Sequence, residues 1–317
     1  MNTDKPIIWS VFIIIIIIIL IIIIIQAYIT RASLIMWSHS HYPKCSSDIT
    51  DECNKLITIT SMPIDVNRPH IDNIFDKDAL RYAIQLTAIF QHYTMNMKKR
   101  DIHKLKLPGI RNMPKYIYEH CNIPIALIWI TDDKMNAIVS IRGTKTITNL
   151  IADYSYNYYN NSPRDNTELV HKGIDIIYMS IKNDLFNTLP DTIKTIFITG
   201  HSMGAGIANL FAYDTAMKGI KTEVHGIAPI RIGNKKFTTD LARIARTSSL
   251  INMADVVPPG LWSFLPNRTA PYTPVCLTHV EPIVVFNNLK KDLLACHMPI
   301  AYMEGLELNP VIVPSMN

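Results

Sequence analysis

The chain contains 317 residues, of which 31 are basic and 26 acidic, and 48% are hydrophobic. This length is enough for one large domain or two small ones. The net charge of +5 is spread along the chain, apart from Lys98-Lys99-Arg100. Scattered positive charge is typical of a solvated surface and argues against a nucleic-acid partner.

Five cysteines lie at positions 45, 53, 121, 276 and 296. They form no C-x-x-C pair and no Cys/His spacing that fits a zinc site, so we expect no metal ion. Cys45 and Cys53 lie close enough in the chain to form a disulfide, and Cys276 with Cys296 is a second candidate pair. Ordinary buried thiols are an equally good interpretation.

Residues 7–25 are apolar except for Ser10 and consist mostly of isoleucine. In a helix this segment would span about 30 Å, the thickness of the membrane hydrocarbon core. It is longer than the core of a cleaved signal peptide and lacks an A-x-A exit, so we expect an uncleaved, single-pass signal anchor over residues 1–30. Lys5 and Arg31 nearly balance, which leaves the side of the membrane open.

The segment after the anchor, residues 31–75, mixes Ser, His, Pro, Asp and Cys with little periodicity. We expect a stalk there, followed by a folded domain over 76–317. Within that domain, Asn160-Asn161-Ser162 and Asn267-Arg268-Thr269 are N-glycosylation sequons. They permit a lumenal or external domain that is a glycoprotein.

The domain begins with a predicted amphipathic helix over 76–93, because acidic residues start it and apolar residues recur at spacings of three and four. The basic segment that follows, to Pro114, has the character of a loop. Two β-branched runs over 123–130 and 137–141, separated by Thr131-Asp132-Asp133-Lys134, predict a hairpin.

Farther along, helical and strand patterns alternate. Helices are expected over 168–185, 204–218, 234–246 and 292–306, and strands over 195–200, 223–229, 249–253 and 275–286. This alternation predicts an α/β fold in which a mostly parallel central sheet is flanked by helices. Antiparallel edge strands are expected near 123–141.

The most informative stretch is Gly200-His201-Ser202-Met203-Gly204. A β-branched run ends at Gly200 and a helix-compatible run begins near Gly204, which is the strand-to-helix setting of a nucleophile elbow. A Gly/Ser turn without chemistry is the alternative. Only 11 of the 317 residues are glycine, so this spacing is unexpected by chance. We therefore interpret Ser202 as a nucleophile.

A serine hydroxyl needs a base, usually histidine, and a carboxylate that orients the imidazole. In α/β-hydrolase-type sheets the order along the chain is serine, acid, histidine. Besides the adjacent His201, three histidines follow the serine. His225 and His279 fall within predicted strands, whereas His297 lies at a loop-to-helix junction after the last strand. His297 is therefore the candidate base.

The candidate acid is Asp255, which comes directly after the strand predicted over 249–253. Asp214 and Asp240 fall within predicted helices instead. Catalytic groups collect at the carboxyl ends of parallel strands, where Asp255 is expected. The alternative interpretations are a turn-capping aspartate at 255 and a helix-start histidine at 297.

With these residues assigned, the chain resembles the class 3, fungal-type lipases of the α/β-hydrolase superfamily over about Asp76 to Leu308. The matching motifs are R-G-[ST] with a lid helix, V-H-x-G, the elbow, P-R-[VI]-G-N, D-x-V-P and a histidine-to-tyrosine segment. They occur in the family's order at 141–144 with 147–153, 170–173, 200–204, 228–234, 255–258 and 297–302. One departure is the extra residue between Pro229 and Arg231.

The resemblance implies a lipase that uses no cofactor and cleaves lipid esters through an acyl-enzyme at a membrane. Its site residues would be the triad of Ser202, Asp255 and His297, an oxyanion hole at Thr144 and Met203, and a lid with Ile147, Leu150, Ile151 and Tyr154. Leu150 replaces an aromatic residue usual in the lid, which bears on substrate preference. A phospholipase A1-type or other carboxylesterase activity is the alternative. A third is a hydrolase-fold interaction protein without catalysis.

Overall fold

The computed structural model describes residues 76–96, 107, 110–119, 123–144, 158–159, 167–255, 257–258, 279–290, 295–308 and 310–313. The predicted anchor, the stalk, the lid residues and both sequons lie outside these residues. In the described ranges, no helix combines the length and the apolar character that a membrane crossing requires. The described elements all belong to one compact unit, Asn54–Asn317.

An 8-stranded sheet forms the centre of this unit, in the order β1-β2-β3-β6-β7-β8-β9-β10. Its strands are β1 (Lys115–Glu119), β2 (Ile123–Ile130), β3 (Asn136–Ile141), β6 (Thr195–His201), β7 (Lys221–Ile227), β8 (Arg246–Asn252), β9 (Ile283–Phe286) and β10 (Val311–Val313). Strands β3, β6, β7, β8 and β9 run parallel, whereas β1, β2 and β10 pair antiparallel at the two edges. A short second sheet pairs β4 (Tyr158–Tyr159) with β5 (Val170–His171).

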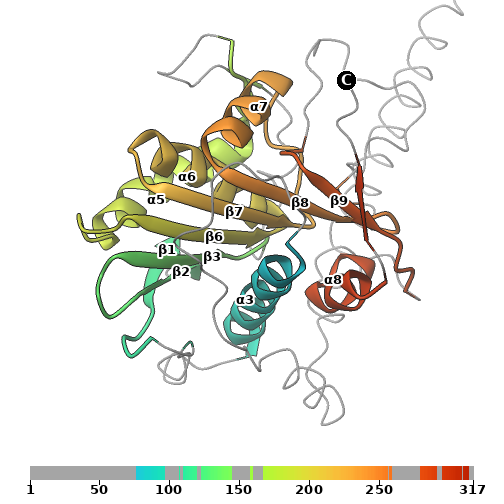
Figure 1. Cartoon of the computed structure of the whole chain (residues 1–317), viewed down its shortest axis with the longest axis horizontal. Coiled ribbons are helices and arrows are strands. Elements are labelled where there is room, and N and C mark those ends of the chain that lie inside the picture. Colours follow the sequence, from blue (N-terminus) through green and yellow to red (C-terminus); the bar gives the residue numbers. More distant parts are fainter. Residues whose placement is uncertain are drawn as a thin grey trace, which may run out of the picture. The chain divides into compact units, whose positions relative to one another are not determined.

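Helices cover both faces of the sheet (Figure 1). On one face lie α3 (Lys77–Asn96) and α8 (Pro299–Leu306), and on the other lie α5 (Lys172–Thr188), α6 (Met203–Met217) and α7 (Lys235–Ile244). The mostly parallel α/β architecture predicted from the sequence is therefore confirmed.

Side chains along β6 alternate between two hydrophobic cores, as the two-residue period of a strand requires. Ile196 and Ile198 pack in the cluster under α5, α6 and α7, whereas Phe197 packs with Tyr82 of α3. Every residue of β6 is buried. This central position gives the residue after the strand, Ser202, a rigid support.

The sequence does not predict two strands at the ends of the domain, and two of its predictions there are corrected. Strand β1 follows directly on the segment expected to be a loop, and β10 lies at an edge that no pattern indicated. In the described part of the last predicted strand, only Ile283–Phe286 forms a strand, directly after the expected interruption at Pro282, so His279 lies outside it. The closing helix is divided into the 3-10 turn η3 (Ala295–His297) and α8, because Pro299 lacks an N–H and begins a new helix.

Candidate active site

Ser202 stands at the sharp turn between β6 and α6, where it is the N-cap residue of the helix with φ 57° and ψ −123°. A residue with a side chain is strained at positive φ, so the surrounding structure must hold it there. The Ser202 N–H donates to the Ile227 carbonyl at 2.9 Å, and the Ser202 carbonyl accepts from the Ala205 N–H at 3.0 Å. The turn is thus fixed to β7 on one side and to α6 on the other.

Two glycines make this turn possible because no side chain fits at their positions. A Cβ on Gly200 would lie 2.2 Å from the Gly204 carbonyl oxygen, and a Cβ on Gly204 would lie 2.3 Å from the Arg142 carbonyl oxygen. Both gaps are far shorter than any contact between a carbon and a backbone oxygen. The G-x-S-x-G spacing therefore reflects the close approach of β6, α6 and the end of β3.

Asp255 and His297, which are far apart in sequence, lie in contact. Asp255 follows β8 and is buried, and His297 ends η3. The His297 Nδ1 and the Asp255 Oδ2 are 2.6 Å apart. Asp255 also accepts hydrogen bonds from the Val257 N–H at 2.9 Å and from the Tyr302 hydroxyl at 2.7 Å.

These contacts determine the charge state of the acid. Burial alone would raise the pKa of Asp255, but the charge and hydrogen bond of His297, with the Val257 N–H and the Tyr302 hydroxyl, hold that pKa below its usual value. Burial and the nearby Asp255 carboxylate raise the pKa of Tyr302 well above the ordinary value of tyrosine. Asp255 therefore stays ionised and Tyr302 stays a neutral donor near pH 7.

His201 connects the turn at Ser202 to His297. Its Nε2 lies 2.7 Å from the His297 carbonyl oxygen, and the two rings have centroids 4.6 Å apart. Because a carbonyl only accepts, Nε2 of His201 carries the proton. Burial, aided by the positive charge that His297 can carry, lowers the pKa of His201 to about 3. His201 is therefore a neutral support and not a base.

The contact that would complete a triad, from Ser202 Oγ to His297, is not among the hydrogen bonds of the described residues. Such contacts are often long without substrate. The alternative base, His279, is not a hydrogen-bond partner of Asp255 among these residues. Burial, with the nearby charge of Arg231, lowers the pKa of His279 to about 4.

The two residues expected to form the oxyanion hole lie on either side of the elbow. Met203 is the first residue of α6, where a helix leaves its first N–H groups without partners inside the helix. Thr144 follows Gly143, at which an added Cβ would lie 3.4 Å from the Ser202 Cβ. The Arg142 guanidinium donates to the carbonyls of Pro124 at 2.6 Å and Gly143 at 2.7 Å. It thereby fixes the end of β3 beside the serine.

The sequence alone does not indicate what His201 and Tyr302 contact. His201 was noted there only as the neighbour of the nucleophile, and Tyr302 only as the end of a matching segment. Their hydrogen bonds cross 96 and 47 positions of the chain. Hydrogen bonds over such separations leave no local pattern.

A strained serine after a central parallel strand, with a histidine–aspartate pair that contacts the residue before the serine, is typical of the α/β-hydrolase type. The family model of class 3 lipases matches residues 138–261 of this chain. The resemblance seen in the sequence motifs is thereby confirmed over these residues, which include the elbow and Asp255 but not His297.

Curated relatives match over little more than a third of the chain. Phospholipase A1-Igamma1, chloroplastic, of Arabidopsis thaliana is 28% identical in an alignment of 131 residues that covers 36% of this chain and 25% of that protein. Phospholipase A1-Igamma2, chloroplastic, of the same plant is 26% identical in an alignment of 135 residues that covers 37% of this chain and 25% of that protein. The matched segment thus spans a quarter of the length of each relative.

Among solved structures, the Rhizomucor miehei lipase propeptide complex is similar with a TM-score of 0.49 and 20% identity, over 72% of this chain and 78% of that one. The refined structure of the Rhizomucor miehei triacylglyceride lipase is similar with a TM-score of 0.46 and 18% identity, over 78% of this chain and 82% of that one.

Proposed function

We propose that this chain is a membrane-anchored serine ester hydrolase that cleaves acylglycerols or related lipid esters through an acyl-enzyme. The observation that carries the proposal is that Ser202 stands at positive φ on the elbow, while His297, which lies 2.6 Å from Asp255, contacts His201, the residue before the serine. His201 joins these two parts, since it is adjacent to Ser202 and bonded to the backbone of His297.

In the reaction that this arrangement favours, Ser202 Oγ attacks the ester carbonyl carbon while its proton passes to Nε2 of His297. Asp255, bonded to Nδ1, orients the ring and stabilises the imidazolium. The N–H groups of Met203 and Thr144 stabilise the oxyanion, and losing one such donor typically costs about 10²–10³ in turnover. His297 then protonates the leaving alcohol, and water attacks the acyl-enzyme by the same steps, releasing the fatty acid.

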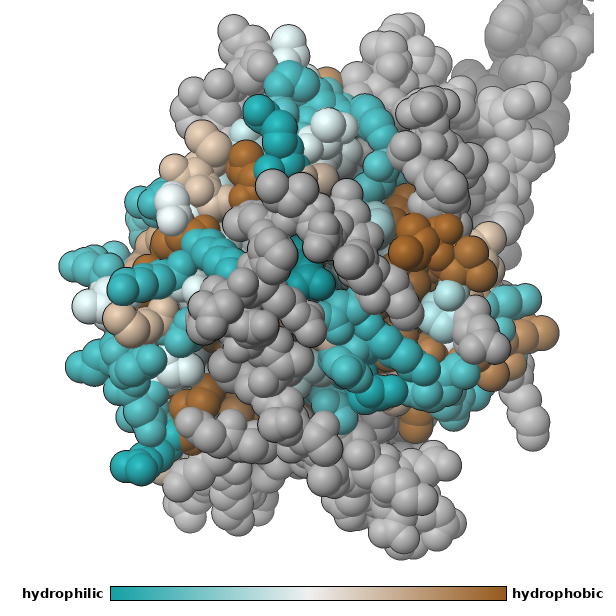
Figure 2. All heavy atoms as spheres, in the orientation of Figure 1, coloured by the Kyte–Doolittle hydropathy of each residue, from teal (hydrophilic) through white to brown (hydrophobic). Residues whose placement is uncertain are grey.

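Apolar surface next to the acid supports a lipid substrate over a soluble ester. Met253, two residues before Asp255, is 65% exposed, and Leu289 after β9 is 73% exposed. Figure 2 shows apolar side chains gathered among polar ones on one face of the molecule. The predicted lid residues 147, 150, 151 and 154 and the isoleucine span add apolar character that suits a lipid surface.

A phospholipase A1-type activity is the second candidate, favoured by the two Arabidopsis relatives, which are named phospholipases A1. It uses the same attack on an acyl ester and differs in the head group of the substrate. The intact set of Ser202, Asp255 and His297 argues against a non-catalytic protein, because a chain that has lost catalysis usually loses a member.

The test combines active-site labelling with a lipid panel on the full chain in detergent micelles. We expect a serine-directed phosphonate to label Ser202 and a folded Ser202→Ala variant to take no label. Release of fatty acid from triacylglycerol, diacylglycerol and phosphatidylcholine with a labelled sn-1 chain then distinguishes the two candidates. A folded wild-type chain that takes no label at Ser202 would refute the proposed function.

A further inference from the structure

A buried asparagine joins two segments of the chain. We call them the acid segment, residues 253–255, and the base segment, residues 295–297. Asn252 is the last residue of β8 and is completely buried. Its Nδ2 donates to the carbonyls of Asn288 at 2.9 Å and Cys296 at 3.1 Å. Its Oδ1 accepts from the N–H groups of Asn288 at 2.9 Å and Ala254 at 3.2 Å. A carboxamide offers two donors and two acceptor sites, so this one is fully used.

These four bonds join three segments of the chain. Ala254 directly precedes the acid, Asp255, and Cys296 directly precedes the base, His297, while Asn288 lies in the segment after β9. The backbone of Asn252 belongs to the same group of contacts. Its N–H donates to the Tyr302 hydroxyl at 3.2 Å, and its carbonyl accepts from the Asp255 N–H at 2.9 Å.

The need for such a connection follows from the chain path. Asp255 and His297 are separated by 42 positions. Asp255 lies in the turn after β8 and His297 ends the single turn η3, so no strand ladder and no shared helix fixes their spacing. Cys296, the neighbour of the base, is a free and buried thiol, so no disulfide holds its loop. Its carbonyl is instead held by the Asn252 amide, across 44 positions. A misplacement of about 1 Å in a reacting group can cost about 10²-fold in rate.

We propose that Asn252 is a positioning residue for the Asp255–His297 pair: its carboxamide sets the distance between the acid segment and the base segment. The proposal rests on the proposed function for its effect on turnover. Its structural consequence, the hydrogen bond between His297 Nδ1 and Asp255, exists in the folded chain and is measurable without any substrate.

The first variant is Asn252→Asp, which has nearly the same shape. It keeps the oxygen that accepts from Ala254 and Asn288, but it loses both N–H donors and turns a second oxygen toward the carbonyls of Asn288 and Cys296. If Asn252 is purely structural, the substitution lowers only the amount or the melting temperature of folded protein. If Asn252 is a positioning residue, the substitution also lowers kcat in the protein that remains folded.

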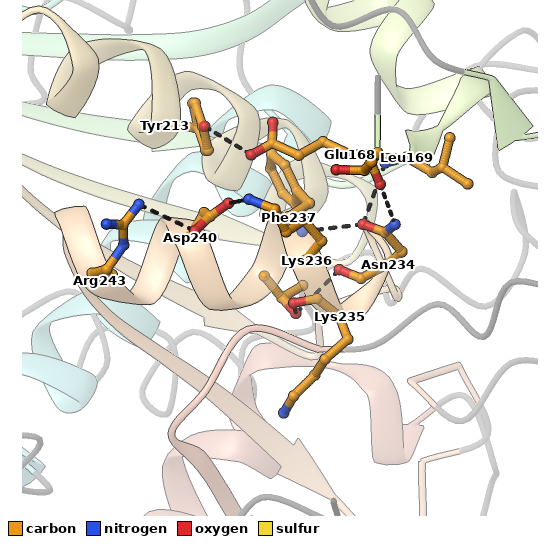
Figure 3. Close-up of polar contacts among 11 residues, drawn as sticks. Glu168, Leu169, Tyr213, Asn234, Lys235, Lys236, Phe237, Asp240 and Arg243 are labelled. Carbon is orange, nitrogen blue, oxygen red and sulfur yellow. Dashed lines mark hydrogen bonds and ion pairs between the residues drawn. The ribbon is translucent and has the colours of Figure 1, made fainter. Parts of the chain in front are cut away.

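The matched control is the same substitution at Asn234, the N-cap of α7. Its Oδ1 accepts from the N–H groups of Leu169 at 3.2 Å and Phe237 at 3.1 Å, and its Nδ2 donates to the Thr167 carbonyl at 2.8 Å (Figure 3). Asn234→Asp therefore also keeps two acceptor bonds and loses the donor. These three partners belong to neither the acid segment nor the base segment.

Two measurements on the full chain in micelles test the positioning role of Asn252. One is the far-downfield proton resonance of the imidazole N–H bonded to Asp255. The other is kcat and KM on the ester that the lipid panel identifies. For Asn252→Asp we expect the resonance to shift or vanish and kcat to fall by about 10²-fold while KM changes by less than about threefold. For Asn234→Asp we expect an unchanged resonance and a kcat within about twofold of wild type.

A folded Asn252→Asp chain with an unchanged resonance and unchanged kcat would overturn the inference. If that variant does not fold, Asn252→Ala, which removes the donors without adding charge, is measured in its place. If neither folds, the residue serves the fold and the positioning role is overturned. A wild-type chain that shows the resonance but takes no phosphonate label would refute the proposed function alone.

Discussion

In the described part of the chain, His297 and His225 each contact a carboxylate, but one lies at the end of the central sheet and the other lies inside it. His297 contacts Asp255 at the carboxyl end of the sheet. His225, within β7, contacts Ser248 Oγ through Nδ1 at 2.6 Å and Glu223 Oε1 through Nε2 at 2.8 Å. By residue type alone, this second set is a complete serine–histidine–carboxylate group.

The surroundings of the two serines differ. Ser248 lies in the middle of β8, and its partner His225 packs with the Phe197 ring at 5.2 Å in the layer under α3. Ser202 stands at positive φ at the N-terminus of α6, where N–H groups can receive an oxyanion. The nitrogens are also used differently, since the carboxylate of a triad contacts Nδ1, whereas Glu223 contacts Nε2.

The His225 group has a structural task instead. Glu223 lies 3.7 Å from Arg246, which lies 3.4 Å from Asp76. Asp76 in turn accepts from the Ala79 N–H at 3.0 Å and so caps the first turn of α3. The group thus links the sheet to the start of α3. The two groups thus share residue types, but of the two serines only Ser202 stands on a strained turn at an open helix end.

The largest expected difference between the two groups is in turnover. Asp255→Asn should lower kcat by about 10⁴-fold, because the amide holds the wrong imidazole tautomer and cannot stabilise the imidazolium. Glu223→Gln should leave kcat within about threefold while lowering stability by about 1 kcal/mol, since it removes a partner of His225 and Arg246. Ester hydrolysis and urea unfolding of the two variants test this contrast. Equal losses of kcat would break it.

A smaller effect is expected in the acid stability of the wild-type chain compared with that of Asp255→Asn. The pKa of Asp255 is lowered in the folded state, so its contribution to stability is present above the unfolded pKa, near 4, and is lost as the pH falls through the folded value. The melting temperature of the wild-type chain should therefore fall more steeply below about pH 4 than that of Asp255→Asn. Parallel curves would show that Asp255 gains nothing from its partners.

Much of the fold and the elbow could be predicted because both depend on residues that are close together in the chain. The period of apolar residues indicates strands and helices, and only glycine fits at positions 200 and 204. Ser202, Asp255 and His297 follow from the order of motifs and from the ends of predicted strands. The catalytic roles of all three stay predictions.

The parts that sequence reasoning missed depend on contacts between distant segments. The bond from Asn252 to Cys296 crosses 44 positions and that from His201 to His297 crosses 96, so neither has a periodic signature. Strand β1, Lys-Tyr-Ile-Tyr-Glu, follows a basic stretch and buries only Ile117 among its described side chains. Its strand character depends on pairing with β2, which the sequence of β1 alone does not show.

The smallest expected effect concerns Tyr302, whose hydroxyl donates to Asp255 at 2.7 Å. Tyr302→Phe keeps the ring, which packs edge-on against Phe286 at 5.3 Å. It removes two hydrogen bonds, the one that the hydroxyl donates to Asp255 and the one that it accepts from the Asn252 N–H at 3.2 Å. We expect kcat to fall by about 3- to 10-fold, because Asp255 keeps His297 and Val257 as partners and so keeps most of its orientation.

Tyr213→Phe is the matched control for this last effect. The Tyr213 hydroxyl donates to Glu168 Oε1 at 3.0 Å, also in a buried contact between a tyrosine and a carboxyl group (Figure 3). Its loss should change the melting temperature without changing kcat. Steady-state hydrolysis and thermal unfolding of both variants separate the two effects. If Tyr302→Phe and Tyr213→Phe lower kcat equally, the Tyr302 contact acts through general stability and not through the orientation of Asp255.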